Sequence, residues 1–163
     1  VVGIAASGVT PFVRAALAEA RRRRGRTVLV AMDRRSPLSR LADVVIAPRV
    51  GPEVLTGSTR LKAGTATKQI LNILTTAAFV RLGKVYGNWM VDLQPRSGKL
   101  RARAERLVQI LGRVSRARAR RYLGAAGGRT KVAIVMARRN LSARAASRLL
   151  REAGGSLRRC LDA

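Results

Sequence analysis

The sequence contains no histidine, a single cysteine, and aromatic residues at only 3% of its 163 positions. Without histidine, the chain can form neither a histidine-ligated metal site nor a Cys/His catalytic pair. Cys160 cannot form an internal disulfide, which fits a cytoplasmic location. Because aromatic residues are scarce, we expect a core built from Ala, Val, Leu and Ile.

Long hydrophobic runs are also missing, and acidic residues are few. No apolar stretch approaches the roughly 20 residues that a membrane span needs, and no signal-peptide pattern is present, so we expect no membrane association. Only eight residues are acidic against 34 basic ones, which gives a net charge of +26. The basic residues are spread along the chain without interleaved aromatics. This pattern indicates a solvated surface, and we do not expect nucleic acid to be the partner.

The first fifty residues alternate between strand and helix patterns. Val1–Ala5, Thr27–Met32 and Val44–Ala47 are apolar runs of strand length. Pro11–Arg24 has apolar residues at helical spacing, with proline at the start and arginines in the last turn, and Ser36–Ala42 begins a short helical turn. Strands that are apolar on both faces and alternate with helices predict an α/β fold with a doubly wound parallel sheet covered on both sides.

The rest of the chain is predicted to be helical. Arg60–Leu82 is apolar nearly all round, so we expect it to be buried in a core or a subunit interface. After Pro95 the composition becomes rich in arginine and alanine, with four helical segments: Leu100–Leu111, Arg116–Leu123, Thr130–Arg139 and Ser142–Ala153. We therefore predict two domains, an α/β domain at 1–98 and a small all-helical domain at 99–163.

Two turns rich in hydroxyl groups are candidate phosphate-binding sites. Each follows a predicted strand and precedes a helix, where free N–H groups and the helix dipole favour an anion. If both strands lie in one parallel sheet, both turns lie at the edge where such folds bind ligands, and we expect them to converge on one phosphate group. The alternative is that these hydroxyls only cap helices. The residues of the two turns are Ser7, Gly8 and Thr10, and Thr56, Gly57, Ser58 and Thr59, with Lys62 close behind.

Acid/base chemistry has few candidates among the eight carboxylates, most of which we interpret as structural. Glu53, three residues before Thr56, could hydrogen-bond a sugar hydroxyl or act as a base. It could equally hold nearby backbone N–H groups. Asp92 has the same two interpretations. We include Glu53 among the substrate-binding residues and assign no catalytic residue and no metal ligand.

Four stretches, in their order and spacing, resemble the later half of the N-acetylmuramic acid 6-phosphate etherases, which are sugar isomerase (SIS) domain enzymes. The resemblance covers roughly residues 1–100 and, more loosely, the helical tail. The stretches are GIAASGVTPFV, SPLSRLADVVIAP, VGPEVLTGSTRLKAGTATKQILN and RLGKVYGNWMVDLQ.

The resemblance implies cleavage of the lactyl ether of N-acetylmuramic acid 6-phosphate to N-acetylglucosamine 6-phosphate and D-lactate, during the recycling of cell-wall sugars. It implies no metal or organic cofactor, a homodimer, and an SIS-type sheet followed by a small helical domain. Ser7 and Thr10 match the family's phosphate-binding turn, and Ser58 with its neighbours matches the second substrate-facing loop. Glu53 falls within the family pattern, but we carry over no catalytic role for it.

The resemblance also implies that part of the family's machinery lies outside these residues. We expect the first strands of the sheet, another phosphate loop and both catalytic glutamates to precede Val1, so that the sheet is incomplete and the chain alone is inactive. One alternative is a non-catalytic regulator that binds sugar phosphates through an SIS domain. Another is a basic nucleic-acid-binding module.

Overall fold

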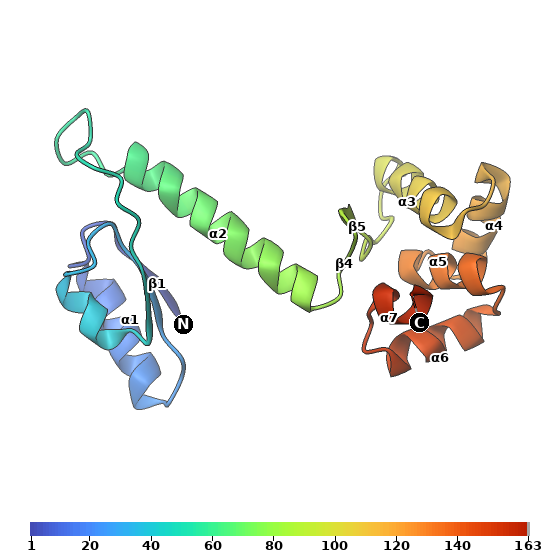
Figure 1. Cartoon of the computed structure of the whole chain (residues 1–163), viewed down its shortest axis with the longest axis horizontal. Coiled ribbons are helices and arrows are strands. Elements are labelled where there is room, and N and C mark those ends of the chain that lie inside the picture. The colour runs from blue at the N-terminus through green and yellow to red at the C-terminus, as the bar shows by residue number, and fades with distance from the viewer. Residues whose placement is uncertain (163) are drawn as a thin grey trace. The chain divides into compact units, whose positions relative to one another are not determined.

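The computed structural model describes residues 1–162 and contains two compact units, Val1–Leu74 and Thr75–Ala163. The two units divide within one helix, α2 (Lys62–Arg81) (Figure 1). Our domain boundary at 98/99 stays a prediction, because compactness within one chain does not define the domains of an assembled protein. Among the described residues, no helix is both long and apolar enough to cross a lipid bilayer.

The first unit contains a three-stranded parallel sheet, as the apolar runs predicted. Its strands are β1 (Val2–Ile4), β2 (Val28–Val30) and β3 (Val44–Ile46), in the order β1-β2-β3. The helix α1 (Pro11–Arg22) and the 3₁₀ helix η1 (Pro37–Leu41) provide the connections. The α/β class and the incomplete parallel sheet are therefore confirmed.

Helix α1 packs closely on one face of this sheet because a glycine lies beneath it. A Cβ atom at Gly3 would lie 2.7 Å from Cγ1 of Val13 and 3.2 Å from the methyl groups of Leu17. Leu29, which pairs with Gly3 in the register, is fully buried in the same cluster as Val13 and Leu17. Close contact between α1 and the sheet thus forms the small core of this unit.

The opposite face of the sheet is open at its edge strands, whereas Val30 in the central strand is buried. Val2 and Val44 share a register position with Val28 and remain 47% and 52% exposed, and Ile4 is 42% exposed. We expected cover on both faces, but within this unit the described core lies on the α1 face. The apolar face that remains is suited to further polypeptide rather than to water.

Helix α2 lies within the predicted range Arg60–Leu82 but is shorter, with 20 residues, and is mostly exposed. Ala63 is its only buried residue, whereas Ile73 is 67% exposed and Phe79 and Val80 are about half exposed. The described residues therefore do not bury α2, and its burial in a core stays a prediction. A subunit interface remains the alternative prediction.

The second unit is a helical bundle organised around one central helix, α5 (Thr130–Arg139). Its residues Val132–Met136 are all buried, and α5 packs against α3, α4, α6 and α7. Serine hydroxyls cap the other four helices by accepting an N–H hydrogen bond, as helix starts of this kind favour. The four helices are α3 (Gly98–Gly112), α4 (Arg116–Ala125), α6 (Ala143–Glu152) and α7 (Leu157–Leu161).

Two short elements of this unit were not predicted. A hairpin of β4 (Val85–Tyr86) and β5 (Trp89–Met90) follows α2, and its continuation places Val91 and Leu93 in the core of the bundle. Helix α7 closes the bundle and buries Cys160. The compact unit Thr75–Ala163 therefore includes this hairpin together with the helices.

The buried position of Cys160 predicts an unreactive thiol. Burial raises the pKa of the Cys160 thiol above its ordinary value of 9.0, so the thiolate that reacts with disulfide reagents is scarce at neutral pH. We expect an aromatic disulfide reagent to label the folded chain about tenfold or more slowly than the chain in denaturant. Equal labelling rates, followed by absorbance, would show that α7 does not stay packed.

Candidate functional site

The turn after β1 contains a glycine, Gly8, that no other residue can replace without displacing Ser36. Gly8 has φ +65°, and its N–H donates to the carbonyl oxygen of Ala5 at 2.9 Å. A Cβ atom at Gly8 would lie only 2.1 Å from Cβ of Ser36 and 2.4 Å from its hydroxyl oxygen. Glycine therefore allows the connection between β2 and β3 to touch the turn that follows β1.

The hydroxyl groups of this turn do not act as helix caps. Thr10 is the N-cap residue of α1, but its side chain accepts no capping hydrogen bond, and residue 11 is a proline with no N–H to offer. Ser7 is exposed, and among residues 1–162 no side-chain hydrogen bond is recorded for Ser7 or Thr10. These donors are therefore available to a ligand at the N-terminus of α1, where orphan N–H groups favour an anion.

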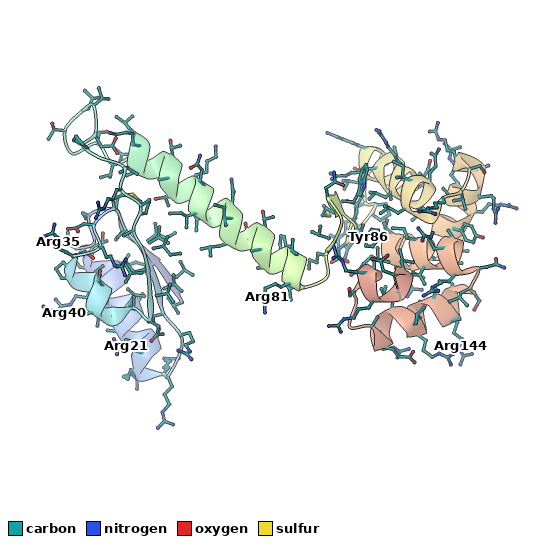
Figure 2. All side chains as sticks on the ribbon, in the orientation of Figure 1. Arg21, Arg35, Arg40, Arg81, Tyr86 and Arg144 are labelled. Carbon is teal, nitrogen blue, oxygen red and sulfur yellow. The ribbon has the colours of Figure 1, made fainter. Side chains whose placement is uncertain are left out.

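A cationic hollow of about 610 Å³ lies beside this turn. Val9 and the almost fully buried Ser36 contribute to its wall, and three arginines line it: Arg14 from α1, Arg35, and Arg40 from η1. Figure 2 shows Arg35 and Arg40 on the same side of this unit. The three arginines and Ser36 form a positively charged environment that suits a phosphate group.

Sequence reasoning missed these arginines and Ser36 as site residues. A usable signal was present, because Arg35 and Ser36 follow the carboxyl end of β2 as Ser7 follows that of β1. The signal was obscured by the excess of arginine along the chain.

The second predicted turn follows β3 and has the local structure of a tight loop. The Ser58 N–H donates to the carbonyl oxygen of Leu55, and the Thr59 N–H donates to that of Gly57, each at 3.0 Å. Gly57 has φ +79° and no atom near the position of a Cβ, and Thr56 is exposed. Both turns follow the carboxyl ends of parallel strands (Figure 1), but their convergence on one phosphate stays a prediction.

Glu53 binds nearby backbone N–H groups, as one of our two interpretations of this residue predicted. Its carboxylate oxygens accept hydrogen bonds from the N–H groups of Lys62 and Ala63, both at 2.9 Å, at the start of α2. The donors Ala63 and then Lys62 lower the pKa of Glu53 from its ordinary value of 4.5, because they favour the ionised form. A carboxylate held in this way is a poor proton carrier at neutral pH, and its binding of a sugar hydroxyl stays a prediction.

Lys62 lies close to the segment that leads into the second turn. Its ammonium nitrogen would be 3.6 Å from a Cβ atom at Gly51, which has φ +69°. The side chain is exposed and remains accessible to an anion at the second turn.

All eight carboxylates of the chain are engaged by donors within it. Side-chain hydrogen bonds from Arg22 lower the pKa of Glu19, and the Thr27 N–H lowers that of Asp43. No group of three or more acidic or cysteine side chains that could hold a metal ion occurs in the described part. The partners are Arg22 and Arg23 for Glu19, the Arg35 N–H for Asp33, the Thr27 N–H for Asp43, the Lys62 and Ala63 N–H groups for Glu53, Lys84 and Lys131 for Asp92, Arg120 and Arg116 for Glu105, Arg148 for Glu152, and the Tyr86 hydroxyl for Asp162.

Comparison with known proteins supports the resemblance on which the site was predicted. The chain is 50% identical over 163 residues, all of its length, to N-acetylmuramic acid 6-phosphate etherase of Mycolicibacterium smegmatis, of which it covers 55%. It is 46% identical over 162 residues to the etherase of Geobacillus thermodenitrificans, covering 99% of the chain and 55% of that relative. For the etherase of Symbiobacterium thermophilum, the identity is 59% over 136 residues, 83% of the chain and 45% of the relative.

The chain belongs to the N-acetylmuramic acid 6-phosphate etherase family. It spans about half the length of the curated relatives it matches. No protein-family model matches it. The predicted resemblance to these etherases is therefore confirmed, while the roles of single residues stay predictions.

Substitution of Gly8 tests whether the first turn depends on its contact with Ser36. Gly8→Ala adds a strained positive φ and a clash, whereas Gly57→Ala, at φ +79° in open space, adds only the strain. We expect Gly57→Ala to lower the free energy of unfolding by about 1–2 kcal/mol and Gly8→Ala to lower it clearly more. Urea unfolding measures both, and equal losses would contradict the close packing of Gly8 on Ser36.

Substitution of Glu53 tests its cap on α2 through pH. Because the pKa of Glu53 is lowered on folding, its stabilising effect is full above pH 4.5 and is lost as pH falls through the lower folded pKa. We expect Glu53→Gln to be less stable than the unsubstituted chain at pH 7, with the difference shrinking towards pH 3. Urea unfolding at both pH values gives this difference, and a difference that does not change with pH would contradict the carboxylate cap.

Proposed function

We propose that the chain supplies the sugar-phosphate-binding part of an enzyme that cleaves the lactyl ether of N-acetylmuramic acid 6-phosphate. The proposal rests on the Ser7 and Thr10 hydroxyls, which make no hydrogen bond within residues 1–162. They flank Val9, which lines a hollow with three arginines, and the chain is 50% identical to an etherase named for this substrate. The phosphate is bound at the N-terminus of α1, and the turn at Thr56–Thr59 contacts the sugar.

The proposed reaction yields N-acetylglucosamine 6-phosphate and D-lactate by acid/base chemistry without a cofactor. Every acidic side chain of residues 1–162 has an internal donor within hydrogen-bond or ion-pair distance, which supports a structural role for these groups. The catalytic carboxylates of the proposed enzyme therefore lie outside this chain, and its own residues bind and orient the substrate.

We propose that the protein forms a larger assembly in the cytoplasm, and exposed apolar surfaces support the assembly. Ile73, Phe79 and Val80 of α2 and the open face of the sheet near Val2 expose large apolar side chains. Surfaces of this kind are usually covered by a protein partner. We propose that α2 packs in a homodimer interface.

Calorimetry with N-acetylmuramic acid 6-phosphate and with its unphosphorylated form tests this proposal. We expect the phosphorylated sugar to bind more tightly. Ser7→Ala combined with Thr10→Val should weaken binding about tenfold or more, because hydrogen bonds to a charged group are worth about 1.5–3 kcal/mol. Thr76→Val, which removes an exposed hydroxyl from α2, is the matched control and should leave binding unchanged.

The same samples test whether this chain binds the substrate without carrying the acid/base groups. We expect no release of D-lactate from the phosphorylated sugar by this chain alone. Equal affinity for the two sugars would contradict the phosphate site, and measurable D-lactate would contradict the placement of the acid/base groups outside the chain.

A further inference from the structure

The helical unit contains a second cavity, which the proposed etherase function does not use. It has a volume of about 1020 Å³, within the range of small-molecule sites. Its walls come from the segment after β5, from α3 and α4, from the first residues of α5, and from α6. The residues that form it all belong to the unit Thr75–Ala163, separate from the turns at Ser7 and Thr56.

The floor of this cavity is apolar. Leu93, Leu123 and Val132 line it and belong to the buried core of the bundle, and Leu150 is partly buried beside them. A bare inorganic ion would gain nothing from this surface. An organic body would gain about 25 cal/mol for each Å² of apolar surface removed from water.

The rim of the cavity has a surplus of positive charge. Two of its acidic groups are already paired, Asp92 with Lys131 at 3.5 Å and Glu105 with Arg120 at 2.9 Å. Four more arginines line the cavity, and all four are exposed: Arg96, Arg101, Arg129 and Arg151. No ion pair is recorded for these four within residues 1–162, so their charge is available to an anion.

The start of α5 adds backbone donors to the same cavity. Arg129 is the N-cap residue and provides no side-chain cap, and the Thr130 hydroxyl donates away from the helix to the carbonyl oxygen of Leu93 at 2.9 Å. The buried Ser147 hydroxyl on the facing helix α6 also has no partner in the described part of the chain. Uncapped N–H groups and an unpartnered hydroxyl thus accompany the arginines.

We propose that this cavity binds a small organic anion, with its phosphate or carboxylate group at the start of α5 and its apolar body on the leucine-lined floor. The volume and the apolar floor favour an organic ligand over an inorganic ion. The absence of aromatic side chains from the lining argues against stacked nucleotide bases.

Amide NMR spectra of the ¹⁵N-labelled full chain test the proposal with three probes: phenyl phosphate, benzoate and inorganic phosphate. We expect phenyl phosphate or benzoate to shift the amide signals of Thr130, Lys131 and Val132, and inorganic phosphate to bind about tenfold or more weakly. Comparison of the first two probes identifies which acidic group is preferred. No shift at these three amides with either organic probe would overturn the proposal.

Matched double variants distinguish specific binding in the cavity from nonspecific attraction to the positively charged surface. Arg101→Gln with Arg151→Gln removes two rim charges. Arg103→Gln with Arg144→Gln removes two exposed charges from the same helices, α3 and α6, at residues that do not line the cavity. Arg144 is labelled in Figure 2. We expect at least tenfold weaker binding in the first pair and less than a twofold change in the second. Equal losses in both pairs would contradict a specific site.

The outcome is independent of the proposed etherase function. Ser7→Ala with Thr10→Val should leave the shifts at the start of α5 unchanged, because those residues belong to the other unit. Loss of these shifts in that variant would contradict a separate second site.

Discussion

Carboxylates held by N–H and guanidinium donors are the interaction on which this structure depends. The chain has eight acidic residues, and five of them connect elements or hold a helix start: Asp43, Glu53, Asp92, Glu105 and Asp162. Asp43 holds the start of β2 through Thr27, and Glu105 joins α3 to α4 through Arg120 at 2.9 Å. Because acidic residues are this scarce, most of the basic side chains have no acidic partner within the described residues.

Local signals in the sequence predicted most of the fold. The range of α5 was predicted to the residue, because its apolar spacing and the Gly127-Gly128 pair before it are local features. The hairpin at Val85–Met90 was missed because two-residue strands are too short to show alternation, although Gly87-Asn88 is a recognisable hairpin turn. The exposure of α2 could not be read from its composition, since an apolar pattern does not say which surface will cover it.

The residues of the candidate site that follow strand ends could be predicted from the sequence. The residues that reach the site through tertiary contacts could not. The strand-turn-helix pattern predicted Ser7 and Thr10 as site residues. Arg14, Arg35 and Arg40 meet at one hollow only after folding, and in so arginine-rich a chain no local signal separates them from solvated arginines. Family resemblance added the substrate class, which neither composition nor spacing contains.

The ammonium group of Lys131 contacts three segments of the helical unit. Nζ of Lys131 donates to the carbonyl oxygens of Gly155 and Gly83, at 3.0 and 3.4 Å, and lies 3.5 Å from a carboxylate oxygen of Asp92. A compact tetrahedral donor suits partners in three directions, whereas a planar guanidinium does not. Acylation of this single amine would remove its charge and weaken its contacts with the turn after α2, the segment after β5 and the loop before α7 at the same time.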